Sequence, residues 1–207
     1  IAYLCKKVLK NGYDKIVLSN DKDYFQLVDE STTIFRPVQT KDNPNGEYVD
    51  MEWMTNNEKC YPYNYILVKA LAGCTSDKIP GIEGVGEKSV KNDFPFLEEH
   101  VEYGVDAIID HAKKNVKKYK KYEKYIVNET LLRDNETLVQ LVDPDISLKS
   151  VDTIYNIVET GSPKFNPYKF RLKLMSEGIS PSNIDNWIGT FATIKQTRIT
   201  LKDGGSV

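Results

Sequence analysis

Three aspartates stand in polar segments that follow elements expected to be buried. Asp21 and Asp23 come directly after the apolar run at residues 16–18, and Asp77 lies in the loop after a helix ending at Ala72. If the backbone stays extended after the run, Asp21 and Asp23 point the same way, because strand side chains alternate. Paired carboxylates suit hard divalent ions such as Mg²⁺ or Mn²⁺. The pattern is compatible with a metal site, but for each aspartate taken alone a turn or capping role is favoured.

A glycine-rich stretch at residues 81–89 (GIEGVGEKS) is the most informative part of the sequence. Gly81 and Gly86 have the spacing of a phosphate-binding loop, but Glu87 stands where that motif requires lysine. The dinucleotide-binding fingerprint also fails, because Ser89 replaces its third glycine and no strand precedes the loop. Both nucleotide-binding motifs are therefore excluded.

The remaining interpretation of this stretch is a tight turn between two helices that a phosphate backbone can approach. In such a hairpin the amides of Gly84 and Gly86 face a phosphate, helped by the N-terminus of the following helix and by Lys88. Exposed carbonyls on the other side of the loop can hold a monovalent cation. The alternative is an ordinary glycine-rich turn, which the spacing disfavours.

A lysine-rich stretch at residues 111–126 holds seven lysines against the single acid Glu123. One interpretation is a phosphate-binding face. The residues that we expect to contact DNA there are Lys117, Lys120 and Lys121. The alternative is a packed stripe with solvated lysines. Its members would be Val116, Tyr119, Tyr122 and Ile126. Both interpretations stay open.

The elements that position these residues follow an α/β rhythm up to residue 72 and are mostly helical afterwards. Apolar spacing predicts a helix over 1–11, a buried strand over 14–20, a short helix over 24–28 and a strand over 33–35. A loop follows at 41–46, and helices are expected over 50–57 and 62–72. Beyond them we expect helices around 87–93, 97–112, 116–132, 151–160, 167–177 and 181–192.

Composition is that of an ordinary soluble globular chain. The 207 residues include 28 Lys and Arg against 30 Asp and Glu, a net charge of −2, with 40% hydrophobic residues. No apolar run approaches the ~18 residues of a membrane span. Three separated cysteines form no disulfide framework, which indicates a reducing compartment. The overall charge gives no sign of nucleic acid, although the lysines are locally gathered.

Two blocks of sequence together resemble the 5′-nuclease family of bacterial and bacteriophage 5′–3′ exonucleases, phage RNase H and flap endonucleases. They are SNDKDYFQLV at 19–28 and ALAGCTSDKIPGIEGVGEKSV at 70–90, in the family's order and at its separation. The resemblance covers residues 1–95. It implies an α/β fold, with part of a PIN-like nuclease core over 1–72, a helix-three-turn-helix and C-terminal helical region over 73–192, and a tail over 193–207.

The resemblance also implies roles for individual residues. Asp21, Asp23 and Asp77 match carboxylates that hold two divalent metals, Mg²⁺ or Mn²⁺, in the family. Backbone positions that match the family's K⁺ contacts are Gly81, Ile82 and Val85. Those that match its phosphate-binding loop are Gly84, Gly86 and Lys88.

Two departures from the family's pattern stand out. Bacterial and phage members usually read G-D-x-x-D-N where this chain has Cys74 and Lys78 for the first Asp and the Asn. Because a thiol is a poor Mg²⁺ ligand, we expect the second metal to be held more weakly. The chain begins at Ile1 without a Met, and residues 1–9 resemble the helix that follows the family's acidic E-x-D-D segment. We therefore expect the family's earlier carboxylates and helical arch to lie upstream.

The resemblance implies a metal-dependent, structure-selective 5′-nuclease of DNA replication or repair. Its partners would be duplex DNA with a 5′ flap or 5′ end, and RNA–DNA hybrid as a further substrate class. We expect a monomer in the cytoplasm of a bacterial or phage-infected cell, associated with the nucleoid. A catalytically inactive duplex-binding module is the alternative, and a scaffold without nucleic acid is the least favoured interpretation.

Overall fold

A computed structural model describes the chain except residues 11, 39–43, 161–164 and 194–207. The described residues divide into two compact units, Ile1–Asp145 and Ile146–Val207. The domain boundary predicted after residue 72 falls inside the first unit. Apart from Thr193, the predicted tail lies outside the described residues.

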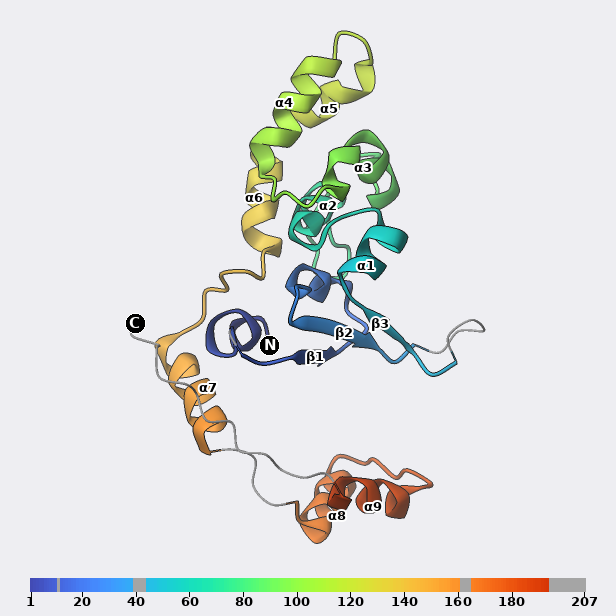
Figure 1. Ribbon diagram of the computed structural model, residues 1–207, viewed down its shortest axis with the longest axis vertical. Coiled ribbons are helices and arrows are strands. Elements are labelled where there is room, and N and C mark those ends of the chain that lie inside the picture. Colours follow the sequence, from blue (N-terminus) through green and yellow to red (C-terminus); the bar gives the residue numbers. More distant parts are fainter. Residues whose placement is uncertain (11, 39–43, 161–164, 194–207) are drawn as a thin grey trace. The chain divides into compact units, whose positions relative to one another are not determined.

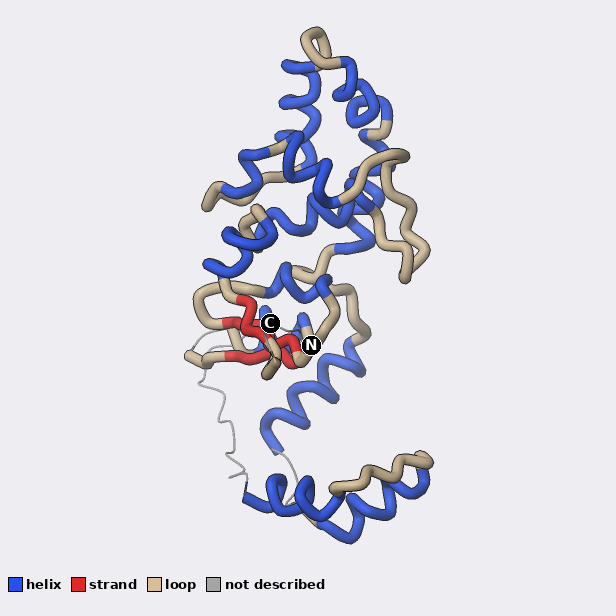
Figure 2. Tube along the Cα trace, turned by 90° about the vertical axis from the view of Figure 1, so that its right-hand side faces the viewer, coloured by secondary structure: helices blue, strands red, loops and turns tan. Residues whose placement is uncertain are grey.

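A small mixed sheet forms one end of the first unit (Figures 1 and 2). Its strands, in the order β1-β2-β3, are β1 (Lys15–Leu18), β2 (Thr32–Arg36) and β3 (Glu47–Val49). β1 pairs in parallel with β2, with Val17 opposite Ile34, and β2 pairs antiparallel with β3, with Ile34 opposite Val49. The sequence predicted β1 and β2 but not β3.

One face of β1 is exposed, contrary to the buried strand that its apolar run predicted. Val17 packs into the core, whereas Ile16 and Leu18 are 65% and 67% exposed. Because successive side chains of a strand point to opposite faces, only one face of β1 contributes to the core of the described residues.

Helices make up the rest of the first unit. The α-helices are α1 (Met51–Trp53), α2 (Tyr65–Ala72), α3 (Glu87–Asp93), α4 (Val105–Asn115), α5 (Glu123–Val127) and α6 (Glu129–Val139). Between them lie π-type turns η1 (Leu4–Val8) and η3 (Met54–Glu58). The 3₁₀ turns are η2 (Lys22–Leu27), η4 (Pro62–Asn64), η5 (Pro95–Glu98) and η6 (Lys120–Tyr122). The predicted helix over 1–11 is thus confirmed only in part.

Two predicted helices differ most from the structure. The helix expected over 97–112 begins only at Val105, after the turn η5. The helix expected over 116–132 is broken into η6, α5 and the start of α6. The break follows from tertiary packing, because Tyr125 is buried and its hydroxyl donates a 2.6 Å hydrogen bond to Asp93 Oδ2. By contrast, α3 has the predicted bounds.

A single hydrophobic core joins the sheet to the helices of the first unit. The buried face of the sheet meets Phe25 of η2 and Tyr65 of α2, whose ring centroids lie 5.4 Å apart. α2 packs against η2, α3 and α6 and is central to the unit. At the end opposite the sheet, α4 packs against α5 (Figures 1 and 2).

The second unit contains three helices among its described residues. They are α7 (Leu148–Thr160), α8 (Pro167–Ser176) and α9 (Ile184–Thr193), close to the predicted segments. None of the three contributes a buried residue. Phe165, Phe170 and Phe191 form a small aromatic cluster with centroids 5.5–5.7 Å apart. No helix in the described part of the chain is long and apolar enough to cross a membrane.

Candidate active site

Asp23 and Asp77, far apart in the sequence, converge with Cys74 into one cluster. One ligand atom from each of the three side chains lies within 4.8 Å of the others. Asp23 is in the first turn of η2, directly after β1, while Cys74 and Asp77 are on the loop that leaves α2. The packing of α2 against η2 brings the two segments together. The structure thus juxtaposes two of the three predicted carboxylates.

Asp21 takes a different place from the one that an extended backbone predicted. Residues from Lys22 onward turn into η2, and the Asp21 carboxylate accepts a 2.9 Å hydrogen bond from the Asp23 amide. Asp21 therefore caps η2, its side chain is exposed, and it is not a member of the 4.8 Å cluster. The condition for parallel side chains is not met, because a local hydrogen bond from an aspartate side chain competes with the extended conformation.

The loop that carries Cys74 and Asp77 is a closed turn. The Cys74 amide donates to Ile79 O and the Ile79 amide to Cys74 O, both at 2.9 Å. Lys78 adopts a left-handed conformation with φ of 59°, which a lysine adopts less readily than an asparagine. Inside the turn, the Cys74 thiol donates to Asp77 Oδ2 at 2.8 Å. The turn therefore points a buried sulfur and an exposed carboxylate at the same position.

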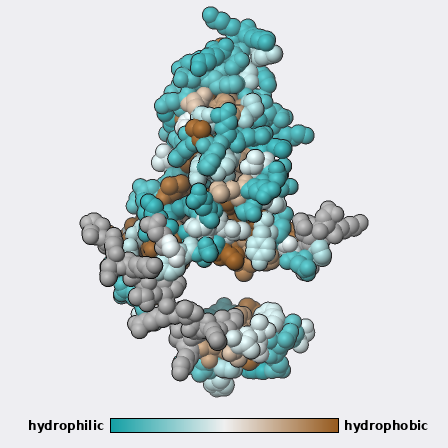
Figure 3. Space-filling view, viewed as in Figure 1, coloured by the Kyte–Doolittle hydropathy of each residue, from teal (hydrophilic) through white to brown (hydrophobic). Residues whose placement is uncertain are grey.

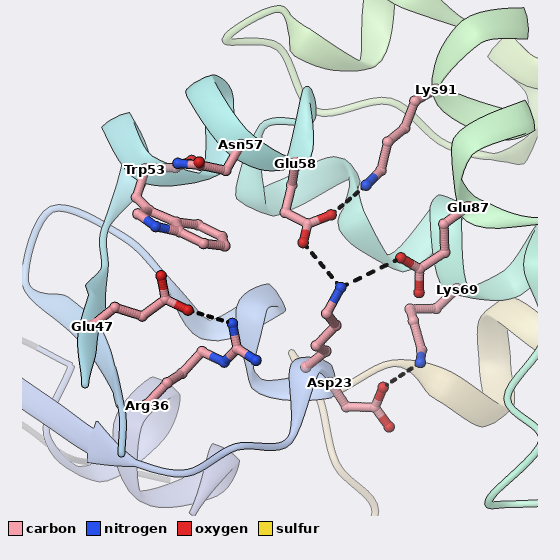
Figure 4. A network of polar contacts seen from close by, with 10 residues as sticks. Asp23, Arg36, Glu47, Trp53, Asn57, Glu58, Lys69, Glu87 and Lys91 are labelled. Carbon is pink, nitrogen blue, oxygen red and sulfur yellow. Dashed lines mark hydrogen bonds and ion pairs between the residues drawn. The ribbon is translucent and has the colours of Figure 1, made fainter. Parts of the chain in front are cut away.

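Asp23 lies against a buried cation. Its Oδ1 is shielded from solvent and lies 2.9 Å from Lys69 Nζ, yet accepts no well-aligned hydrogen bond (Figure 4). Burial by itself would lower the pKa of Lys69, but its pairing with Asp23 raises the pKa above the ordinary lysine value. Lys69 stays protonated and neutralises part of the negative charge of the cluster.

The donor set fits a divalent cation. Two carboxylates and a thiol can approach one ion from Asp23, Cys74 and Asp77, and the shielded Oδ1 of Asp23 has unused acceptor capacity. Buried acceptors are normally satisfied, so this atom marks a place where a further cation would be favourable.

The glycine stretch begins where two backbone segments touch. A Cβ on Gly73 would lie 2.3 Å from Gly81 N, and one on Gly81 would lie 2.2 Å from Ala72 O. Gly81 is therefore required by close packing against the end of α2. Asn135 of α6 fastens the same region, donating to Ala70 O at 2.9 Å and to Pro80 O at 2.8 Å.

The remainder of the loop alternates between buried anchors and exposed backbone. The side chains of Ile82 and Val85 are buried, and the Val85 amide donates to Ile82 O at 3.0 Å. Gly84 has a φ of +69°, and a Cβ at either Gly84 or Gly86 would meet nothing within 4 Å. The loop thus has open space where the sequence predicted approach of a phosphate backbone.

Lysines of the 111–126 stretch lie at the end of the first unit that carries α4 and α5, which is largely hydrophilic on the face in Figure 3. Lys117 and Lys120 are exposed, whereas Lys121 forms an ion pair with the buried Asp93. Lys124 Nζ lies 3.4 Å from Gly84 O, linking this stretch to the glycine loop. Of the packed stripe, Tyr122 is buried but Tyr119 is 47% exposed, so that interpretation holds only in part.

Sequence reasoning missed a charge network that joins the two motif blocks. Glu58, at the end of η3, accepts from Lys22 Nζ at 3.1 Å and from Lys91 Nζ of α3 (Figure 4). Burial would raise the pKa of Glu58, but the hydrogen bonds and charges of Lys91 and Lys22 lower it below the ordinary value. Lys69 was missed too, although a lone lysine in the apolar run of α2 signals a buried ion pair.

Comparisons with known proteins agree with the motifs, although no protein-family model matches the chain. Over 89 residues it is 33% identical to the thermostable DNA polymerase I of Thermus thermophilus, covering 43% of this chain and 10% of that protein. Over 127 residues it is 32% identical to a 5′–3′ exonuclease of Halalkalibacterium halodurans, covering 61% and 39% respectively.

Solved structures of bacteriophage T5 5′-exonuclease have a similar fold. One, with divalent metal ions (zinc) bound, has a TM-score of 0.53 and 25% identity, covering 68% of this chain and 48% of that one. Another, a T5 flap endonuclease complex with DNA and metal ions, has a TM-score of 0.52 and 24% identity over similar shares, 68% and 48%. The chain spans less than half the length of these relatives. Motifs, relatives and fold agree, and the chain is a homologue of the bacterial and bacteriophage 5′-nucleases.

Proposed function

We propose that this chain is part of a metal-dependent, structure-selective 5′-nuclease that hydrolyses phosphodiester bonds in DNA. The observation that carries the proposal is the convergence of Asp23 and Asp77 beside Cys74. The glycine loop, which the backbone places next along the chain, supports it. The DNA polymerase I and T5 exonuclease relatives support the same class of reaction.

Asp23 and Asp77 would hold a divalent cation, with Mg²⁺ or Mn²⁺ as the family's ions and Asp21 as a further ligand from the edge of the cluster. When bound, such a cation activates a water and stabilises the leaving oxygen of a phosphodiester. Lys69 keeps Asp23 ionised and in place through their 2.9 Å contact. The closed turn from Cys74 to Ile79 keeps Asp77 directed at the same position.

The glycine loop would hold the duplex beside the cut. The exposed amides of Gly84 and Gly86, together with Lys88, would contact a phosphate, and Lys117 and Lys120 would extend the contact along the backbone. Lys121 is a weaker candidate, because Asp93 already neutralises it. We propose a K⁺ at the carbonyls of Gly81, Ile82 and Val85. Ile82 O retains a lone pair for it beside its bond to Val85.

The test is cleavage of a 5′-flap duplex by the full-length protein that contains this chain. Asp23→Ala and Asp77→Ala should each lower the cleavage rate by at least about 100-fold, because they remove ligands of the catalytic cation. Flap binding in Ca²⁺ should be retained. Asp152→Ala, an exposed carboxylate of α7, is the matched control and should cleave normally.

Unchanged Mg²⁺- or Mn²⁺-dependent cleavage by the Asp23 and Asp77 variants would contradict the proposal. One observation favours the second candidate, a duplex-binding module without catalysis: Cys74 stands where the family has an acidic ligand. If the full-length protein binds flap DNA with a salt-dependent affinity but gives no product with either metal, that second function is the correct one.

A further inference from the structure

Cys74 changes the chemistry of the metal cluster, and this inference rests on the proposed function for the place of the site. The side chain is 8% exposed, so its sulfur is directed inward and not toward solvent. Its partners there are Asp77 Oδ2 at 2.8 Å and Ser76 Oγ at 3.1 Å. The thiol is a member of the same 4.8 Å cluster as the two carboxylates.

A sulfur ligand in a small cluster selects among metals. Mg²⁺ requires oxygen ligands, while thiolate favours Zn²⁺ and other thiophilic ions. A tetrahedral zinc with Zn–S of about 2.3 Å and Zn–O of about 2.1 Å separates its ligand atoms by about 3.4–3.6 Å. The present cluster, with all three ligand atoms within 4.8 Å, needs only small side-chain movements to reach those separations.

We propose that Asp23, Cys74 and Asp77 form a mixed thiolate–carboxylate site that prefers Zn²⁺-class ions to Mg²⁺. On binding, the Cys74 S–H bond breaks, its proton passes to solvent, and the sulfur lone pair forms the bond to the metal. The 2.8 Å contact between Sγ and Asp77 Oδ2 is then released, because both atoms become ligands. Lys69 stays beside Asp23 and balances the charge.

The test uses metal titrations of the 207-residue chain, without any measurement of nuclease activity. Titration with Cd²⁺ or Co²⁺ should produce a sulfur-to-metal charge-transfer band. Calorimetric titration should show Zn²⁺ binding at least tenfold more tightly than Mg²⁺. In Cys74→Ser the band should disappear, and Zn²⁺ affinity should fall by at least about tenfold. One fewer proton should be released per Zn²⁺ bound.

Two further variants complete the design. Cys5→Ala removes a buried thiol outside the cluster and should keep the band, the Zn²⁺ affinity and the proton release. Cys74→Asp should lose the band and gain Mg²⁺ affinity. Circular dichroism of each variant verifies folding.

Absence of a charge-transfer band in the wild-type chain, or a band that persists in Cys74→Ser, would overturn the proposal. So would equal Zn²⁺ affinity in the wild type and Cys74→Ser. These outcomes are distinct from failure of the nuclease proposal. A thiolate band in a protein whose full-length form never cleaves DNA would support the zinc-class site and refute the nuclease.

Discussion

Asp21 combines two roles that a pair of substitutions can separate. Its carboxylate caps η2 by accepting from the Asp23 amide, while the resemblance assigns it to the metal site. Asn caps a helix about as well as Asp, whereas Ala costs about 1 kcal/mol of stability. We predict that Asp21→Asn keeps the melting temperature but lowers cleavage by the full-length protein at least about tenfold, because the negative charge is lost. Full activity of Asp21→Asn would restrict Asp21 to capping.

Among single residues, sequence reasoning succeeded where chemistry depends on residue type and failed where it depends on a contact. The types of Asp23 and Asp77 and their place after buried elements were enough to bring them to one site. Asp21 was misdirected, because a hydrogen bond two residues long decides its orientation. The pairing of Lys121 with Asp93 spans 28 residues and leaves no trace in a local pattern.

Between elements, Glu58 is the residue on which the relative position of η2 and α3 depends. Its side chain is 9% exposed and faces lysines from both elements. We predict that Glu58→Gln lowers the free energy of unfolding at neutral pH by about 2 kcal/mol, since two ammonium groups are left without their shared carboxylate. The measurement is urea unfolding, with Glu52→Gln, an exposed residue of α1, as the control.

The pH dependence of this effect has a defined sign. Because the pKa of Glu58 is lowered in the folded chain, its contribution is complete above the ordinary glutamate value of about 4.3 and is lost as the pH falls below it. The wild type and Glu58→Gln should therefore converge in stability toward acidic pH. A difference that stays constant down to pH 3 would show that Glu58 acts by shape and not by charge.

Helices with a clear apolar period and a capping residue were predictable from the sequence. Asp50 accepts from the Trp53 amide at 2.8 Å, as its position before the predicted helix indicates. The break between residues 116 and 122 was not predictable, because lysine and tyrosine are compatible with a continuous helix. The three-residue strand β3 was missed for a similar reason, since its pairing with β2 is a nonlocal interaction.

For the whole molecule, the distribution of buried residues predicts where stability resides. The core cluster ends at Val139, and the helices of the second unit contribute no buried residue. We predict that a chain ending at Asp145 unfolds cooperatively, with a melting temperature within about 4 °C of the 207-residue chain. Calorimetry of both chains is the measurement. A noncooperative transition, or a fall of more than about 10 °C, would contradict it.

The contact between Gly73 and Gly81 has a consequence for substrate selection. The backbone that leads to the metal loop and the backbone that leads to the phosphate loop touch there without an intervening side chain. In the proposed nuclease, the number of nucleotides between the cut and the gripped phosphate is then measured by main-chain geometry, like the fixed jaw of a calliper. Drift in surrounding side chains, or exchange of one metal for another, would alter the rate of cutting but leave its register along the DNA unchanged.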